Sequence, residues 1–282
     1  MGKVKSGKLK GRNDIVRGMS EKQCYRMTVS YRGAAYSGWQ SQPGGNAVQD
    51  VIEHALRGLH QDRSIRLNGC SRTDRGVHAL GQVASYYAAP SPFVPDDQLM
   101  EAINRKLPAD IRIKELKPVK AGFRPRREAK GKTYTYVINT ATPNPFLADL
   151  ATNCLECRQM DAIRRALKTL EGTHDFSAFT VEAERPDDCR RAIHLAQLDR
   201  FDHYVCLSFA GSSFLYRMVR RLVGALLEIG RGNRPPEWIG ELLAGSADPE
   251  EIKTAPPQGL YLMQVYYEQI PAAVELDSVP FL

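Results

Sequence analysis

The chain has 282 residues, of which 43% are hydrophobic and 25% charged, and its formal net charge is +7. A chain of this length and composition can bury a substantial core, which excludes a largely disordered protein. No run of about 18 apolar residues occurs, which excludes a transmembrane helix. The excess of positive charge favours a polyanionic partner, with a nucleic acid as the first candidate.

The start of the chain is basic and poor in apolar side chains. Before position 20 it contains one acid, Asp14, and the bases Lys3, Lys5, Lys8, Lys10, Arg12 and Arg17. A charge run of this kind buries too little apolar surface to fold on its own. Residues 1–22 are therefore predicted to form a basic, disordered tail.

The cysteines are scattered rather than paired along the chain. They are Cys24, Cys70, Cys154, Cys157, Cys189 and Cys206. Scattered thiols in a chain of this size indicate reduced cysteines and a cytoplasmic protein, not a disulfide framework. Cys154 and Cys157 form a C-x-x-C pair, but a structural zinc site would require a second close pair. The sequence therefore predicts no metal site.

The first half of the chain alternates between strand and helix signals. Residues 25–31 alternate apolar and polar side chains, as a half-buried strand does. Asn46 is the expected N-cap of an amphipathic helix that continues to residue 59. The other expected elements are strands at 65–70, 82–88 and 111–119 and a helix at 96–107. This order predicts a compact α+β unit over residues 23–122.

The second half repeats this arrangement, although no sequence repeat of fixed period is present. The expected elements are strands at 133–139, 204–210 and 260–268 and helices at 160–170, 213–230 and 238–243. They predict a second α+β unit over residues 123–270, followed by an irregular C-terminal tail at 271–282. The predicted fold class is α+β, with two similar halves around a mostly antiparallel central sheet.

One loop combines an acid with two arginines. The segment Arg72-Thr73-Asp74-Arg75-Gly76-Val77-His78-Ala79 lies between two predicted strands. The neighbouring positive charges favour an ionised carboxylate, which can act as a nucleophile or base. Loops on a rigid scaffold often hold catalytic groups. The same residue types also form ordinary solvated turns, so this segment alone leaves both interpretations of Asp74 open.

The predicted helix at 213–230 carries basic residues opposite its apolar face. Arg217, Arg220 and Arg221 lie within two turns of each other. They form either a solvated basic face or a stripe that binds phosphates. A further alternative is that one of them points inward and pairs with a buried carboxylate.

A basic stretch precedes the predicted strand that contains Tyr134 and Tyr136. Its members are Arg124, Arg126, Arg127, Lys130 and Lys132. Tyrosines two residues apart share one face of a strand. Basic residues beside aromatic rings are typical of proteins that stack flipped-out RNA bases. The alternative is that both rings belong to the core.

Several well-known site patterns do not occur. The sequence has no G-x-x-x-x-G-K-[ST], no G-x-G-x-x-G after a strand, no G-x-S-x-G and no H-E-x-x-H. It therefore predicts neither a nucleotide cofactor nor zinc-dependent hydrolysis, and no cofactor is expected.

Together with the loop at 72–79, several other segments resemble motifs of the TruA family of tRNA pseudouridine synthases. They are Lys132-Thr133-Tyr134-Thr135-Tyr136, Gly172-Thr173-His174-Asp175-Phe176-Ser177-Ala178-Phe179, the helix from Phe214 to Gly224, and Ala255-Pro256-Pro257-Gln258-Gly259-Leu260. These motifs occur in the family's order and span residues 25–267.

The resemblance implies a pseudouridine-synthase-like fold and an isomerase that needs no cofactor or metal. It implies that Asp74 is the catalytic nucleophile and that Arg220 pairs with it. Tyr134 is expected to stack on the target uracil and to serve as the base that removes a proton. Arg72 is expected to help displace or replace the flipped base, and Leu262 to form an apolar wall of the pocket.

Members of this family act on uridines at tRNA positions 38, 39 and 40 in the anticodon arm, and they are usually homodimers. The resemblance therefore implies tRNA as the partner and substrate. During the reaction the aspartate either adds to uracil C6 or acts at the ribose C1′, and the sequence leaves both routes open.

Three positions depart from the family pattern. Arg75 stands where bacterial members usually have Ala, Cys70 where Gly or Ala is common, and Arg127 where an aromatic residue is frequent. None of them removes a proposed catalytic group. Two other functions remain as alternatives. One is a non-catalytic RNA-binding or RNA-folding protein on the same scaffold. The other is a nucleoside or glycoside hydrolase, which usually needs a second acid.

Overall fold

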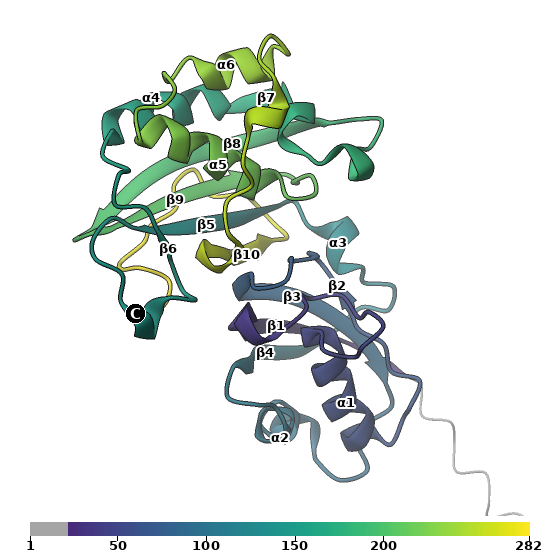
Figure 1. Cartoon of the computed structure of the whole chain (residues 1–282). Helices are drawn as coiled ribbons and strands as arrows, with labels where there is room; N and C mark the ends of the chain where they lie inside the picture. Colours follow the sequence, from purple (N-terminus) through teal and green to yellow (C-terminus); the bar gives the residue numbers. More distant parts are fainter. Residues whose placement is uncertain (1–21) are drawn as a thin grey trace, which may run out of the picture.

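A computed structural model describes residues 22–282 of the chain (Figure 1). The predicted basic tail therefore lies, except for Lys22, outside the described residues. The N-terminal part contains four strands and two helices. They are β1 (Gln23–Tyr31), α1 (Val48–His60), β2 (Asn68–Gly69), β3 (His78–Ala88), α2 (Leu99–Lys106) and β4 (Ile111–Val119).

A short helix, α3 (Pro125–Glu128), leads into the C-terminal part. The further elements are β5 (Gly131–Asn139), β6 (Thr152–Asn153), α4 (Met160–Leu170), β7 (Gly172–Asp175), β8 (Arg190–Phe201), β9 (Tyr204–Gly211), α5 (Met218–Gly230), α6 (Trp238–Leu243) and β10 (Leu260–Tyr266). Single turns of 3-10 helix occur at Gly33–Ala35, Asp96–Gln98, Pro145–Leu147, Ser177–Phe179, Glu182–Glu184, Pro249–Glu251 and Pro257–Gly259.

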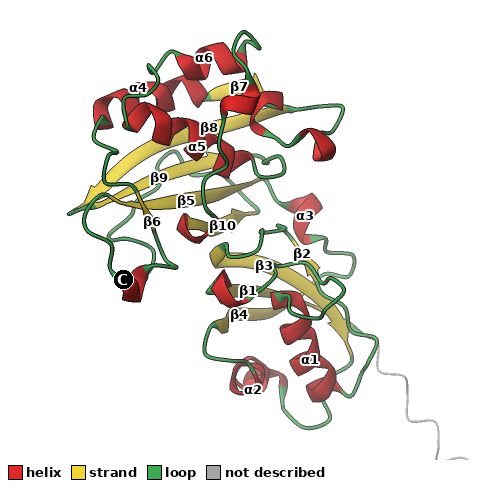
Figure 2. Ribbon diagram, viewed as in Figure 1, coloured by secondary structure: helices red, strands yellow, loops and turns green. Residues whose placement is uncertain are grey.

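All strands belong to one ten-stranded sheet (Figure 2). Its main order is β4-β1-β3-β10-β5-β9-β8-β7, with β2 paired to β3 and β6 paired to β5. Every neighbouring pair is antiparallel except β10 with β3 and β6 with β5. The predicted α+β class with a mostly antiparallel central sheet is thus confirmed.

Strand β10 joins the two parts of the sheet. Leu262 pairs with Ala79 of β3 on one side and with Tyr134 of β5 on the other. The loop that precedes β3 therefore ends two strands away from Tyr134, although 60 positions separate Asp74 from Tyr134 in sequence (134 − 74). This pairing brings residues from both halves to one place.

The two faces of the C-terminal strands are covered differently. Helices α4, α5 and α6 lie together on one side, and the C-terminus lies on the other (Figure 1). Val137 and Tyr261 form a small buried cluster on the second side with Val279 of the C-terminal segment. Their neighbours Tyr136 and Leu262 belong to the main core. Within residues 22–282, no helix is long and apolar enough to cross a membrane.

The start of α1 differs from the prediction by one residue. Ala47, not Asn46, is the N-cap, and its N–H donates to the Asp50 carboxylate at 3.1 Å. The Asn46 side chain instead donates to the Ala35 carbonyl at 3.0 Å. Asn46 therefore holds the preceding loop, and the helix takes its capping acceptor from its own first turn.

Other boundaries differ more. The helix expected from residue 213 begins at Met218, because Arg217 has a left-handed backbone with φ of 56°. The strand expected at 65–70 is reduced to β2. Strand β8 was not predicted, since a register shift between Ile193 and Leu195 breaks the apolar alternation that marks a strand.

Candidate active site

Buried residues hold the loop between β2 and β3 in place through hydrogen bonds. The hydroxyl groups of Thr73 and Tyr31 are hydrogen-bonded at 2.7 Å, and the Trp39 N–H donates to the Thr73 carbonyl at 3.1 Å. After Asp74 the chain turns back, with the Val77 N–H donating to the Asp74 carbonyl at 3.2 Å. Gly76 makes this turn possible with φ of 81°, a conformation that favours glycine. Asp74 therefore projects from a fixed turn.

His78, at the end of the same loop, has a structural environment. Its Nδ1 accepts from the Gly33 N–H at 3.1 Å, and its Nε2 is 2.8 Å from the Asp149 carbonyl. Burial lowers the pKa of the ring, which is only 2% exposed. Both ring nitrogens are occupied, so the neutral imidazole anchors the loop to the segment before β6.

Arg220 of α5 pairs with Asp74 across the two halves. Its Nη1 donates to Asp74 Oδ2 at 2.7 Å, and the Asp74 and Arg220 side chains are 18% and 12% exposed. A half-buried, charge-assisted contact of this kind fixes the direction of the carboxylate. The inward-pointing arginine that the sequence left as an alternative is therefore Arg220.

The segment before β10 holds Arg220 in place. The Arg220 Nε donates to the Ala255 carbonyl at 2.8 Å, and the Ala255 N–H donates to the Arg220 carbonyl at 3.0 Å. This close approach requires glycine at position 224, because a β-carbon there would overlap the Lys253 carbonyl oxygen. The A-P-x-x-G-L segment thus buttresses the arginine that orients Asp74.

The other two arginines of the predicted basic stripe have different environments. The Arg221 guanidinium donates to the carbonyls of Ala178 and Pro249 at 3.0 and 2.6 Å, so it ties loops to the helix. The Arg217 Nε lies 4.0 Å from Asp74 Oδ2, and its guanidinium lies 4.9 Å from the centre of the Tyr216 ring. Of the three arginines in this stripe, Arg217 is the one that is exposed beside the carboxylate.

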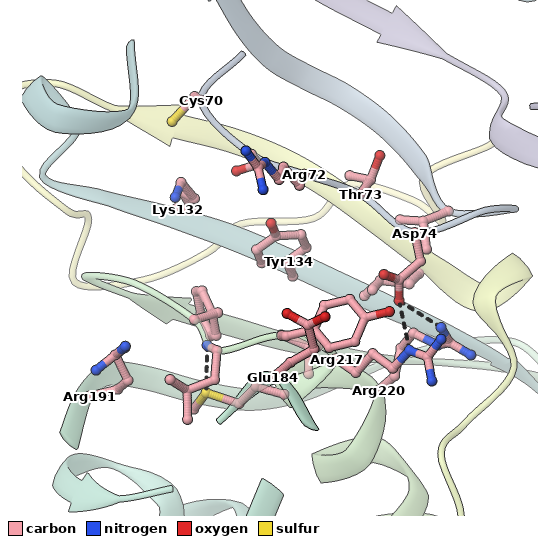
Figure 3. A pocket seen from close by; sticks show the side chains of 18 of the residues that line it. Cys70, Arg72, Thr73, Asp74, Lys132, Tyr134, Glu184, Arg191, Arg217 and Arg220 are labelled. Carbon is pink, nitrogen blue, oxygen red and sulfur yellow. Dashed lines mark hydrogen bonds and ion pairs between the residues drawn. The ribbon is translucent and has the colours of Figure 1, made fainter. Parts of the chain in front are cut away.

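A cavity of about 360 Å³ opens beside Asp74. Figure 3 shows the Asp74 carboxylate directed toward Arg217 and Arg220, with Tyr134 beside them. The basic side chains that line it are Arg72, Arg126, Lys132, Arg191, Arg217 and Arg220, whereas its acids are Asp74 and Glu184. The cavity is therefore strongly positive, as a site for a polyanion must be.

The two tyrosines of β5 have separate roles. Tyr134 lines the cavity and meets Phe214 edge to face, with ring centres 5.2 Å apart. Burial raises its pKa to about 12, so the phenol is protonated near neutral pH. Tyr136 is fully buried and donates to the Pro256 carbonyl at 2.8 Å. Tyr136 therefore belongs to the core alone, whereas Tyr134 is a core residue that also lines the cavity.

Leu262 and Arg72 occupy contrasting places. Leu262 is fully buried between β3 and β5, and it is not among the residues that line the cavity, whereas Leu260 is. Arg72 lines the cavity and is exposed. Asp74, Tyr134, Arg72 and Arg220 are thus brought together, and Leu262 lies behind them in the sheet.

Sequence analysis did not identify Ser71 as a cavity residue, and it named Lys132 only as a member of a basic stretch and of a family motif. The Ser71 hydroxyl is buried and has no hydrogen-bond partner within residues 22–282. Burial lowers the pKa of the Lys132 ammonium, which also lacks an ion pair within that range. A buried polar group without a protein partner is costly, so both are available to a bound molecule. Ser71 directly precedes Arg72, and Lys132 lies two residues before Tyr134. This proximity to proposed site residues is the sequence feature that could have identified both.

The arrangement of the thiols and other ligands adds no metal centre to the described part of the chain. In residues 22–282, no group of three or more His, Cys, Asp and Glu side chains is arranged to hold a metal ion. All six cysteines are free and buried.

Comparison with known proteins identifies the class of this chain. The sequence model of a family described as tRNA pseudouridine synthase matches residues 27–126 and 166–268. A tRNA pseudouridine synthase A from Acetivibrio thermocellus is 40% identical over 243 residues, which are 86% of this chain and 98% of the relative. The protein of that name from Akkermansia muciniphila is 41% identical over 252 residues, 86% of this chain and 95% of the relative.

A further relative of the same name, from Geobacillus sp., is 39% identical over 246 residues, which are 86% of this chain and 98% of the relative. In a solved archaeal box H/ACA sRNP complex, a chain 10% identical covers 72% of this chain and 42% of that chain, with a TM-score of 0.32. That likeness is too weak to establish a shared site. The chain belongs to the tRNA pseudouridine synthase family, and its reaction class is isomerisation.

Proposed function

We propose that this protein converts uridine to pseudouridine at positions 38–40 in the anticodon arm of tRNA, with Asp74 as the nucleophile. The observation that carries the proposal is the Asp74–Arg220 contact of 2.7 Å at the wall of a positively charged cavity. A single oriented carboxylate, a buried tyrosine and several free cations are the groups that this chemistry requires.

The reaction exchanges one bond for another within the same nucleotide. The glycosidic bond between C1′ and N1 breaks, uracil rotates, a bond between C1′ and C5 forms, and the C5 proton leaves while N1 gains one. The Asp74 carboxylate forms a transient bond, either to C6 of the ring or to C1′ of the ribose, and is released unchanged. No electrons enter or leave, so the atoms and charges balance.

The surrounding residues divide the remaining tasks. Arg220 holds the carboxylate in position, and Tyr134 stacks on the uracil and removes the C5 proton. The uridine must leave its stack to reach the cavity. Arg72, which is exposed and lines the cavity, helps to displace or replace the flipped base. Leu262 does not line the cavity, and its proposed role is indirect: it lies on the strand that pairs with both β3 and β5.

The proposal extends to the wider organisation of the protein. Residues 23–122 carry the catalytic loop, and residues 123–270 supply most of the RNA-binding surface and the contacts of a homodimer. Free cysteines that are all buried support a cytoplasmic location. The mass in solution, measured by light scattering with and without tRNA, tests the dimer.

Tritium release from C5 of uridine tests the proposed reaction. tRNA transcripts carrying [5-³H]uridine are incubated with the wild-type protein and with Asp74→Ala. C5 loses its hydrogen only when C1′ becomes attached to it, so release by the wild type alone supports both the isomerisation and the role of Asp74. Asp74→Ala is expected to bind tRNA nearly as well as the wild type.

Four other outcomes contradict the proposal or a part of it. Release by Asp74→Ala at the wild-type rate overturns the assignment of Asp74. Tight tRNA binding without release by either protein favours the RNA-binding alternative. Appearance of free uracil favours a hydrolase. Mapping of the product along the tRNA tests the anticodon-arm positions, and product outside positions 38–40 overturns that part.

A further inference from the structure

A second cavity lies against the same Asp74–Arg220 pair. It has a volume of about 470 Å³, and it shares Asp74, Arg217 and Arg220 with the first cavity. Arg75 and Gln258 line only the second. This size is within the range of small-molecule sites in proteins. A ligand placed at Asp74 in the first cavity is therefore next to a second hollow.

The charges in this second cavity do not cancel. Asp74 is paired with Arg220, and Asp149 is paired with Arg32 at 2.6 Å. Arg75 has no hydrogen bond or ion pair with any described residue, and Arg217 comes no closer than 4.0 Å to a carboxylate. The second cavity is therefore lined by one guanidinium without a protein partner, that of Arg75, and by a second, that of Arg217, which makes only a long contact with Asp74. Both can bind an anion.

The backbone conformation at Arg217 and beside Arg75 fixes the points from which both side chains project. Arg217 adopts a left-handed conformation with φ of 56°, which is uncommon and unfavourable for a residue with a β-carbon. It is the N-cap of α5 but its side chain makes no capping hydrogen bond. Arg75 precedes Gly76 in the tight turn that projects Asp74. Neither position depends on a flexible loop end.

A uridine within an RNA chain supplies the matching anion. Its ribose carries one phosphate on the 5′ side and one on the 3′ side, so a uridine bound at Asp74 necessarily brings two phosphates within one nucleotide of the carboxylate. Arginine binds phosphate through two parallel hydrogen bonds and is the preferred residue for this contact.

We propose that the second cavity is a subsite for the nucleotide next to the target uridine, and that Arg75 and Arg217 bind the phosphate linking the two. The proposal rests on the proposed function.

A binding cycle with neutralised phosphates tests the subsite. tRNA is assembled from synthetic pieces with one methylphosphonate, which carries no charge, on either the 5′ or the 3′ side of the target uridine. Dissociation constants are measured for the wild type, Arg75→Ala and Arg217→Ala. We expect the methylphosphonate on one side to weaken wild-type binding about tenfold, as does Arg75→Ala on native tRNA.

The combination of the two changes is the decisive measurement. If Arg75 binds that phosphate, Arg75→Ala with the methylphosphonate tRNA loses no more affinity than the wild type loses with that tRNA, rather than the product of the two single losses, because the methylphosphonate already removes the contact with Arg75. The logarithm of the association constant falls with the logarithm of the salt concentration, and Arg75→Ala is also expected to reduce the steepness of this fall by about 0.7. Arg217→Ala is expected to show the same coupling to the same phosphate.

Arg165→Ala is the matched control, because Arg165 is an exposed arginine on α4 outside both cavities. It should change neither the salt slope nor the effect of the methylphosphonate. Multiplicative losses at both phosphates, or unchanged binding by Arg75→Ala, overturn the subsite. Tritium release by the wild type is measured on the same tRNA, so that a failure of the proposed function is recognised separately.

Discussion

The two ends of helix α5 use the same residue types for different purposes. At its N-terminal end, Arg217 is exposed to the cavities, has a left-handed backbone and makes no capping hydrogen bond. At its C-terminal end, Arg231 pairs with Glu228 at 2.7 Å, and the second oxygen of that carboxylate accepts from Asn233 at 2.8 Å. The N-terminal end leaves the Arg217 guanidinium without a close ion pair, whereas the C-terminal end pairs its charged groups with one another.

The cysteine pair shows the same contrast. Cys154 and Cys157 resemble a reactive motif, but both are buried. Cys157 packs against Gly230 at the C-terminal end of α5, which we call its closed end because the charged groups there are paired with one another. Asp74 has a weaker local signature yet faces two cavities. Access to a cavity, more than the type of residue, therefore distinguishes the candidate site near the N-terminal end of α5 from the buried cysteines near its C-terminal end.

Arg220 and Arg221 provide the largest expected difference, because they are neighbours with opposite tasks. Arg220→Ala removes the contact that orients Asp74, and we expect kcat to fall about 10²- to 10³-fold. Arg221→Ala removes contacts to loop carbonyls, and we expect a loss of about 1–3 kcal/mol in the free energy of unfolding with kcat preserved. Single-turnover kinetics and urea unfolding measure the two effects. Equal losses of kcat in the two variants would contradict the separate roles expected for Arg220 and Arg221.

Tyr134 and Tyr136 sharpen the comparison on a neighbouring strand. Tyr134→Phe is expected to slow tritium release about 10²-fold while tRNA binding persists. Because burial raises the pKa of Tyr134 to about 12, the phenolate fraction rises tenfold with each pH unit below that value. Release limited by this base should therefore increase between about pH 7 and pH 9, and Tyr134→Phe should lose the increase.

Tyr136→Phe is the matched control, since Tyr136 lies in the core rather than the cavity. It should lower stability by about 1 kcal/mol and leave the pH profile of the rate unchanged. A wild-type rate in Tyr134→Phe would show that another group removes the proton.

Gly230→Ala tests the closed end of α5 and has the smallest expected effect on the reaction. A β-carbon at this position would overlap the Cys157 sulfur and would lie 2.8 Å from Ile163 Cδ1. Overpacking of this kind typically costs about 1–3 kcal/mol of stability. We expect a lower melting temperature with unchanged kcat for the folded protein. A large fall in kcat without a change in stability would link the closed end to the active site.

The strongly periodic elements were predictable from the sequence. The helices at 160–170 and 238–243 and the strand at 111–119 have the bounds that apolar periodicity predicted. The missed strand β8 and the late start of α5 share a cause. A register shift in one and a left-handed residue in the other interrupt the local pattern, and long-range pairing stabilises them.

By itself the sequence determined the α+β class, the loop that presents Asp74 and the basic character of the surface that meets a polyanion. These properties follow from local periodicity, turn residues and composition. Local patterns left open which arginine reaches Asp74 and which tyrosine faces the cavity, and the family resemblance implied Arg220 and Tyr134. The tertiary structure brings these two to Asp74 and to the cavity, and it alone decided where Leu262 lies. Those outcomes depend on β10 pairing with both β3 and β5 and on the segment at 253–256 packing on α5. Such contacts join residues far apart in the chain, and no local pattern encodes them.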